Sequence, residues 1–348
     1  MKKNIVVLLI IFITAYLIYI ATVLFSPLPM PQSNIEIEIP YGSTFREVAD
    51  IFSKENIIRN KNLFIFAGRV TGIDRKIRAG YYSLSRSMSH LELLRALKRG
   101  QIITYSITVL EGDTLREIGE KLSGKGIVSH QDFEKITKDE DLLFAYDIDA
   151  PSAEGYLFPD TYTIPKGMKP EDAIGMMIKR MREKFSPDLM KRASELGFSE
   201  REVLTLASII EKEAAVDVER PIISAVYHNR LKKKIRLQAD PTSIYGVKSF
   251  KEKITLSDLK RKTAYNTYII YGLPPGPIAS PGIKSITAAL YPADVSYLYF
   301  VSNNDGTHHF SVTAAEHQAA VKAYREKKTL ENTTNSPQGK NRKQNETT

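Results

Sequence analysis

An uncharged apolar run over residues 5–25 is the strongest constraint on how this chain folds. At about 1.5 Å of rise per helical residue, such a run covers roughly 30 Å, the thickness of the hydrocarbon core of a bilayer. A cleavable signal peptide has a shorter apolar core, of about 7–15 residues, and a small-residue cleavage site. Here the run ends at Phe25 and Ser26 and a proline-rich stretch follows. The sequence therefore predicts an uncleaved transmembrane helix.

The charges around the apolar run predict its orientation. Lys2 and Lys3 precede the run, and the first charged residue after it is Glu36. Because basic residues stay on the cytoplasmic side of a membrane span, we expect residues 1–4 in the cytoplasm and the chain from Gln32 onward outside the membrane. The alternative is a core helix that is buried in a folded domain.

The composition narrows the chemistry that this chain can perform. It has 49 Lys and Arg residues against 40 Asp and Glu residues, a net charge of +9 that suits an anionic partner. The expected export makes nucleic acid an improbable choice. The absence of cysteine excludes disulfides, thiolate nucleophiles and Cys-based metal sites. His308, His309 and His317 lack the helical spacing of a zinc site, so we predict no metal and no cofactor.

A strand, turn and helix occur twice after the apolar run. Residues 35–39 alternate like a half-buried strand and lead through a turn to a helix over residues 45–54, and residues 105–109 begin a second copy. The residues shared by the two copies are Gly42 and Gly112, Thr44 and Thr114, Arg46 and Arg116, Glu47 and Glu117, Ser53 and Ser123, and Ile57 and Ile127. In each copy the threonine lies where a helix needs an N-cap.

These patterns predict an α+β architecture. Residues 26–34 are expected to form a proline-rich spacer, because Pro cannot continue a helix. Between the copies we expect a strand over residues 80–84 and a helix from Ser89 to Leu97. The unit over residues 35–100 resembles the LysM-like modules that bind cell-wall glycan, although a spacer without a ligand is an equally simple interpretation.

The remainder divides into a larger domain and a tail. Residues 101–326 are expected to form the larger α+β domain, with the second repeat copy inside residues 105–150. Residues 327–348 contain a single large apolar residue, Leu330, and are predicted to be a disordered tail.

A helix expected over residues 202–216 carries the most informative carboxyl groups. Glu211 and Glu213 fall on opposite edges of its apolar stripe, while Lys212 is expected to point outward. Small residues such as Ser208 neighbour Glu211, which favours Glu211 as the group that faces a cleft. A carboxyl at the edge of an apolar surface is disfavoured as an anion, as suits a general acid, but a structural ion pair is the competing interpretation.

Several loops follow that contain more Pro and Gly residues than a linker requires. Together with the preceding segments, these loops resemble the endolytic murein transglycosylase family, whose members are called YceG-like. The motifs that carry the resemblance are residues 154–162 (EGYLFPDTY), 206–213 (LASIIEKE), 237–242 (LQADPT), 244–246 (IYG), 263–268 (TAYNTY), 272–276 (GLPPG) and 297–301 (YLYFV). They occur in the family's order and extend the resemblance over about residues 35–325.

The resemblance implies that Glu211 is the catalytic residue of a lyase that cuts peptidoglycan strands. Glu211 would protonate the glycosidic oxygen between N-acetylmuramic acid and N-acetylglucosamine, and would then accept the proton of the muramic acid C6 hydroxyl as a 1,6-anhydro ring closes. Gln238, Asp240, Tyr245 and Asn266 would stabilise the transition state or hold the sugars, unless they only shape loops. The family also implies a place beside peptidoglycan synthases.

Two other functions fit the same sequence. In a hydrolytic muramidase, water would replace the C6 hydroxyl as the nucleophile. In a non-catalytic scaffold, the module and the tyrosine-rich loops would bind peptidoglycan and recruit synthases without cutting it.

Overall fold

The computed structural model describes residues 2–29, 34–73, 77–303 and 305–334. The chain forms two compact units. The first contains residues 1–107 and 163–169, and the second contains residues 108–162 and 170–348. The boundary falls inside strand β3 (Thr104–Thr108), which pairs with β4 (Thr161–Pro165).

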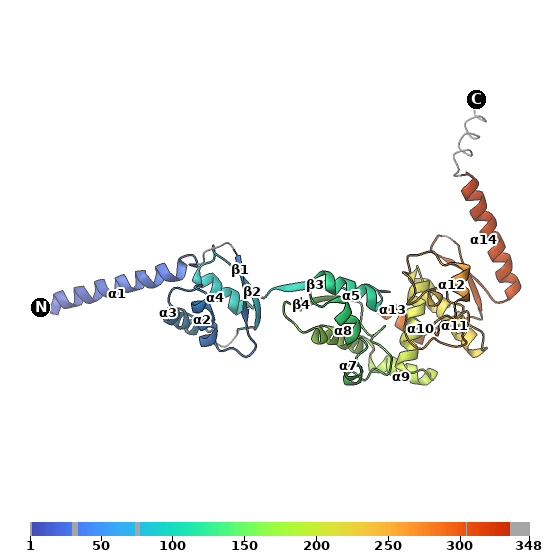
Figure 1. Cartoon of the computed structure of the whole chain (residues 1–348), viewed down its shortest axis with the longest axis horizontal. Coiled ribbons are helices and arrows are strands. Elements are labelled where there is room, and N and C mark those ends of the chain that lie inside the picture. Colours follow the sequence, from blue (N-terminus) through green and yellow to red (C-terminus); the bar gives the residue numbers. More distant parts are fainter. Residues whose placement is uncertain (1, 30–33, 74–76, 304, 335–348) are drawn as a thin grey trace, which may run out of the picture. The chain divides into compact units, whose positions relative to one another are not determined.

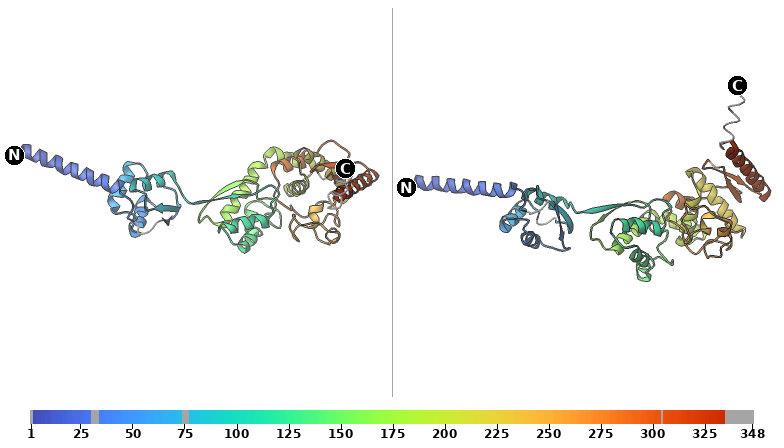
Figure 2. Two further views of the ribbon diagram at one scale, coloured as in Figure 1. Left: turned by 90° about the horizontal axis from the view of Figure 1, so that it is seen from above. Right: turned by 45° about the horizontal axis from the view of Figure 1, so that its top comes forward.

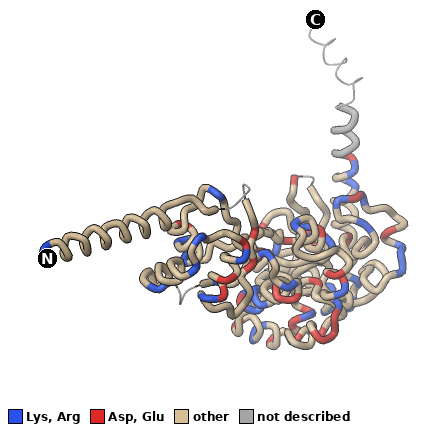
Figure 3. The backbone as a smooth tube through the Cα atoms, turned by 60° about the vertical axis from the view of Figure 1, so that its left-hand side comes forward, with Lys and Arg blue, Asp and Glu red and all other residues tan. Residues whose placement is uncertain are grey.

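Helix α1 (Lys2–Phe25) is the predicted apolar helix (Figure 1). Among the described residues it is the one helix long and apolar enough to cross a membrane, over Lys3–Phe25. None of this span is buried against the rest of the protein, so the alternative of a buried core helix is wrong. Figure 3 shows the tube of α1 without charged residues beyond its basic start, and Figure 2 shows it as one straight helix.

The rest of the first unit packs helices against a two-stranded antiparallel sheet. Strand β1 (Asn34–Ile39) pairs with β2 (Gly80–Ser85), with Ile37 opposite Tyr82. The helices are α2 (Phe45–Lys54), α3 (Lys61–Val70) and α4 (His90–Arg99). The core between sheet and helices is apolar and contains Val48, Phe52, Leu84 and Leu94.

The two copies of the sequence repeat have the same local structure. Thr44 and Thr114 cap α2 and α5 (Leu115–Gly124), each within a reciprocal capping box with the glutamate three residues later. The glycines of the two turns have φ of +81° and +80°, a region that glycine adopts without steric cost. The repeat and both predicted N-caps are therefore confirmed.

The segment expected to be a free spacer is partly built into the first unit. Leu28 is 2% exposed and its N–H donates to the Met88 carbonyl oxygen at 2.8 Å, while Pro27 bridges Ser89. The prediction is wrong for these residues, because burying the apolar Leu28 side chain outweighs the tendency of proline-rich segments to stay extended in solvent. Residues 30–33 lie outside the described residues.

The second unit is mainly helical. Its other helices are α6 (His130–Ile136), α7 (Glu140–Ala145), α8 (Pro170–Lys184), α9 (Pro187–Leu196), α10 (Glu200–Glu213), α11 (Arg220–Lys232), α12 (Leu256–Lys260), α13 (Ile283–Leu290) and α14 (Ala314–Thr334). Two 3-10 turns, η1 (Asp217–Glu219) and η2 (Asp240–Ser243), and the antiparallel pair β5 (Tyr299–Ser302) and β6 (His308–Ser311) complete it.

Helix α10 is the central element of the second unit. It packs against α9, α11 and α13, and every residue from Val203 to Ile210 is buried. Ser199 caps it through a capping box with Glu202. The helix ends at Glu213 and not at Val216 as predicted, because the backbone of Ala214 is extended and the Glu213 carboxyl is bound by groups outside the helix.

Helix α14 extends past the predicted start of the tail. It continues to Thr334, so residues 327–334 are helical, whereas residues 335–348 lie outside the described residues. Low hydrophobicity alone therefore did not predict the structure of this segment.

The capping box of the second repeat copy predicts a stability effect. We expect Thr114→Ala to destabilise the second unit by about 1 kcal/mol, because the Glu117 N–H in the first turn of α5 loses its side-chain acceptor. Thr114→Ser retains the hydroxyl and should lie close to the wild type. Thermal unfolding of the full chain in detergent, followed by circular dichroism, measures both, and equal losses in the two variants would contradict a capping role.

Candidate active site

Glu211 is held in a fixed position on α10 by a cation and a backbone amide. Its side chain is 5% exposed, and the Arg220 guanidinium contacts its Oε1 at 2.9 Å. The Gly282 N–H donates to its Oε2 at 2.9 Å. Both contacts stabilise the carboxylate form and fix the direction of the carboxyl group. The structure therefore contains the ion pair that was the competing interpretation of this residue.

The partners of Glu211 come from the starts of two helices. Arg220 is the first residue of α11, and its guanidinium also donates to Asp217 at 3.1 Å and to Ser285 of α13. Gly282 is the N-cap of α13, and its N–H is one of those that a helix leaves free at this end. The site is thus assembled where α10, α11 and α13 pack together.

A second carboxyl group, which the sequence reasoning missed, borders Glu211. Glu111 lies in the turn before α5, and this turn is fixed by bonds of 2.8 Å from Gly112 N–H to the Ser280 oxygen and from Ser280 N–H to the Asp113 oxygen. Desolvation and the charge of Glu211 raise the pKa of Glu111 above its ordinary value. The sequence feature that could have identified Glu111 is its place in the turn of the second repeat copy. We interpreted that turn only as the start of a helix.

Lys212 does not point into solvent as predicted. Its Nζ donates to the Gly112 oxygen at 3.2 Å and lies 4.2 Å from the centre of the Phe250 ring. Burial lowers the pKa of Lys212, while the charges of Glu211 and Glu154 are among those that oppose this shift. The prediction is wrong because the turn before α5 and the loop around Phe250 cover this face of α10, which the helix pattern alone does not reveal.

A groove of about 1270 Å³ lies in the second unit and is lined in part by Phe250, the residue whose ring Lys212 contacts. Its walls come from the start of α5, from α6 and from the loop that carries Tyr245 and Phe250. The Tyr245 hydroxyl donates to Glu154 Oε2 at 2.9 Å, and the Tyr245 ring centre is 4.6 Å from that of Tyr265. Burial raises the pKa of Glu154 to about 7, although the hydrogen bond from Tyr245 opposes the shift. One predicted site residue, Tyr245, thus lines a groove.

Asp240 belongs to a different group of contacts, around Glu213. The Tyr268 hydroxyl donates to Asp240 Oδ1 at 2.5 Å, and the Tyr227 hydroxyl donates to Glu213 Oε1 at 3.2 Å. Burial and the charge of Asp240 raise the pKa of Glu213 to about 8. Both Asp240 and Gln238 remain exposed, so their side chains are accessible to a ligand.

Gln238 has a backbone conformation that is rare for its residue type. Its φ is +47°, and its N–H donates to the Thr267 oxygen at 3.2 Å. Such a conformation costs free energy and is found where the surrounding structure imposes it, often at functional sites.

Asn266 is fully buried and shapes a loop. Its side-chain amide donates to the carbonyl oxygens of Asp258, Leu259 and Arg261, and its Oδ1 accepts the Tyr268 N–H at 3.0 Å. This placement favours the loop-shaping interpretation that the sequence left open. Within the described part of the chain, no hydrogen bond or ion pair joins Glu211 to Gln238, Asp240, Tyr245 or Asn266.

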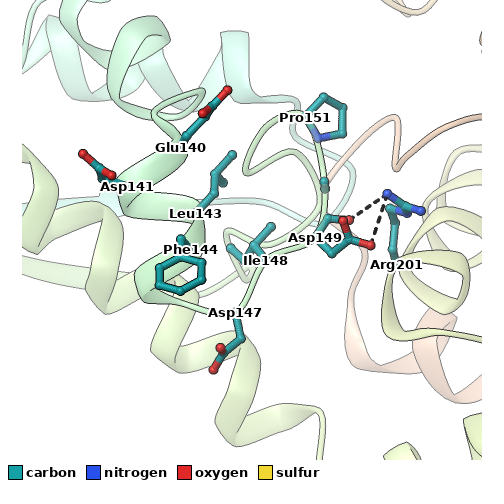
Figure 4. A pocket seen from close by; sticks show the side chains of 10 residues that line it. Glu140, Asp141, Leu143, Phe144, Asp147, Ile148, Asp149, Pro151 and Arg201 are labelled. Carbon is teal, nitrogen blue, oxygen red and sulfur yellow. Dashed lines mark hydrogen bonds and ion pairs between the residues drawn. The ribbon is translucent and has the colours of Figure 1, made fainter.

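A second pocket contains none of the predicted site residues. It measures about 800 Å³ and lies beside α7, where Phe144 and Ile148 line it and Arg201 binds Asp149 (Figure 4). Its polar groups are mostly acidic. Glu211 and its partners are not among the residues that line it.

With this geometry in place, comparisons with known proteins identify the class. The chain is 34% identical to the endolytic murein transglycosylase of Bacillus subtilis (strain 168) over 316 residues, which is 84% of this chain and 85% of that protein. It is 28% identical to the endolytic murein transglycosylase of Streptococcus pneumoniae serotype 2 over 334 residues, 86% of this chain and 60% of that protein. The class is thus that of proteins named for murein transglycosylation.

The family follows from two further matches. The crystal structure of a putative YceG-like protein from Listeria monocytogenes aligns with 82% of this chain and 98% of that one, at a TM-score of 0.58 and 33% identity. The model of the YceG-like family matches residues 37–323. The chain belongs to the YceG-like family, as the motifs of its sequence indicated.

Glu213 predicts how stability depends on pH. The pKa of Glu213 in the folded protein, about 8, lies above its ordinary value of 4.5. The contribution of Glu213 to the free energy of unfolding is therefore fully present below about pH 4.5, and it is lost as the pH rises from there through about 8. We expect Glu213→Gln to unfold at a higher temperature than the wild type at pH 8, with a smaller difference at pH 5. Thermal unfolding at both pH values tests this, and a difference that does not change with pH would contradict it.

Proposed function

We propose that this protein is a membrane-anchored endolytic lytic transglycosylase with Glu211 as its catalytic residue. It cuts the β-1,4 bond between N-acetylmuramic acid and N-acetylglucosamine inside peptidoglycan strands. The main support for the proposal is that Arg220 and the Gly282 N–H fix the direction of the Glu211 carboxyl. Glu211 lies on α10, the helix that contains the family motif of residues 206–213. The names of two relatives, which match most of this chain, support the same reaction.

Glu211 acts twice in the proposed reaction. As an acid it donates its proton to the glycosidic oxygen, and the bond from C1 of the muramic acid to that oxygen breaks. As a base it then takes the proton of the C6 hydroxyl, whose oxygen bonds to C1 and closes the 1,6-anhydro ring. The substrate supplies the nucleophile, so a second protein carboxyl in that role is not needed.

Arg220 and Gly282 stabilise Glu211 between the two steps. After the first proton transfer Glu211 is an anion, and the Arg220 guanidinium and Gly282 N–H already point at its two oxygens. Because these groups are positioned before the reaction, they stabilise the charge without reorganising.

The exposed polar residues near α10 are the proposed sugar contacts. Gln238 and Asp240 offer an amide and a carboxylate to sugar hydroxyls, and Tyr245 lines a groove of about 1270 Å³. We leave Asn266 out of this set, because its side chain is used inside its own loop.

The proposal includes an anchor at the cell membrane. In the proposal α1 spans the membrane with residues 1–4 in the cytoplasm, so the rest of the first unit and the second unit are extracytoplasmic. Residues 35–100 form the proposed LysM-like module that contacts glycan. An enzyme so anchored would cut nascent strands close to the synthases that make them, and would thereby terminate their growth.

Glu211→Gln tests the proposal directly. Full-length protein in detergent is incubated with uncrosslinked glycan strands, and the products are analysed by mass spectrometry. We expect internal fragments that end in 1,6-anhydro-muramic acid from the wild type, and a loss of at least about a hundredfold in rate for Glu211→Gln, because amide cannot transfer the proton. Glu202→Gln, on the same helix and able to keep its capping contact, is the matched control and should retain activity.

Each other outcome points to a different function. Reducing ends in place of anhydro ends, recognised by the mass of one added water, would make the protein a hydrolytic muramidase. Strands that are bound but left intact by wild type and variant alike would make it a scaffold. Activity that survives in Glu211→Gln would remove the catalytic assignment.

The proposed sugar contacts predict a different kinetic effect. We expect Asp240→Asn and Gln238→Ala to raise the KM for glycan strands several-fold, with a smaller effect on kcat, because each weakens or removes a hydrogen bond that is made in the ground state as well as in the transition state. Initial rates over a range of strand concentrations measure this, and unchanged values of KM in both variants would remove these residues from the binding site.

A further inference from the structure

Glu111 and Glu211 approach the same backbone unit from different segments of the chain. The Gly282 N–H donates to Glu211 Oε2 at 2.9 Å. A Cβ atom built on Gly282 would lie 1.9 Å from Glu111 Oε1, so the Glu111 carboxyl occupies the space that a side chain at position 282 would fill. Gly282 has an ordinary φ of −75°, so its lack of a side chain serves to admit Glu111 and not to relieve backbone strain.

The charges around these two carboxyls do not balance. Arg220 binds Glu211 and Asp217, and Lys284 binds Asp217. Arg220, Lys284 and Asp217 also act electrostatically on Glu111, and Lys212 acts on Glu211 although its Nζ is engaged with Gly112 and Phe250. The charged groups that act on Glu111 are two carboxyls, Glu211 and Asp217, and two cations, Arg220 and Lys284, so with Glu111 itself three carboxyls face two cations. A cluster with one excess negative charge binds a proton more readily than an isolated ion pair does.

The excess negative charge bears on how Glu211 can be protonated in the proposed reaction. Glu211 must carry a proton to act as an acid, yet Arg220 and the Gly282 N–H favour its anion. A neighbouring negative charge opposes both effects. Glu111 remains exposed on its outer side, where a bound strand would exclude water and strengthen the interaction between the two carboxyls.

We propose that Glu111 is a positioning residue that keeps a proton available to Glu211 by opposing the charge of Arg220. The inference rests on the proposed function, since it assigns a role to Glu111 in the same reaction. Glu111 itself makes no bond to the substrate in this role. The two carboxyls act as a pair that holds one proton before the glycosidic bond breaks.

The pH dependence of kcat for Glu111→Gln tests the inference. In the wild type, the rate should fall on the alkaline side as the pair loses its proton. In Glu111→Gln this fall should begin about one pH unit lower, which makes the variant about tenfold slower on the alkaline side and within about twofold of wild type at acidic pH. The amide has the size of the carboxyl and Glu111 is exposed, so the fold should not depend on the charge.

Two matched variants separate the charge of Glu111 from its shape. Glu111→Asp keeps the charge and should retain the alkaline limb of the wild type. Gly282→Ala should displace the Glu111 carboxyl and shift the limb in the same direction as Glu111→Gln. Combining Gly282→Ala with Glu111→Gln should then give no further shift of the limb.

The outcomes distinguish this inference from the proposed function. An alkaline limb that stays in place in Glu111→Gln, or a rate that falls equally at every pH, would overturn the role of Glu111 even if Glu211→Gln is inactive. A wild type that yields no anhydro ends, or an active Glu211→Gln, would overturn the proposed function itself. A limb that moves in Glu111→Gln and not in Glu111→Asp supports the inference.

Discussion

The contact between Arg220 and Glu211 is the interaction on which the second unit depends. It joins the end of α10 to the start of α11, and the Gly282 N–H ties the same carboxyl to the start of α13. A buried charge is tolerated only when it is paired, so these helices must keep their mutual positions for the pair to persist. The same contact that holds the three helices together therefore also orients the proposed catalytic group.

Much of the fold was predictable because local rules decide it. The apolar run, the alternating strands and the Thr44 and Thr114 caps are properties of short segments, and the structure confirms them. The family of the chain was also readable from its motifs. Errors arose where a distant segment supplied the deciding contact. Leu28 is buried in the core of the first unit, and Lys212 donates a hydrogen bond to the Gly112 oxygen. Neither contact can be predicted from the residues that neighbour Leu28 or Lys212 in the sequence.

The candidate site shows the same division. Its central residue, Glu211, was predicted from helix periodicity and from the resemblance, and its assignment as the catalyst stays a prediction. Helix periodicity places a residue on one face of a helix but does not predict which distant residues pack against that face. Arg220, Gly282 and Glu111 were therefore not predicted as neighbours of Glu211. Asn266 was predicted as a site residue because it lies in a family motif. In the structure its side-chain amide donates only to backbone oxygens of its own loop region.

The burial of Leu28 against the first unit determines how the proposed enzyme would search for its substrate. Because the chain enters a folded core within a few residues of Phe25, the rest of the first unit has little slack relative to the end of α1. With α1 in a bilayer, that unit would diffuse laterally with its anchor in two dimensions. Encounters with growing strands would then scale with the number of molecules per membrane area, and not with a concentration in the surrounding volume.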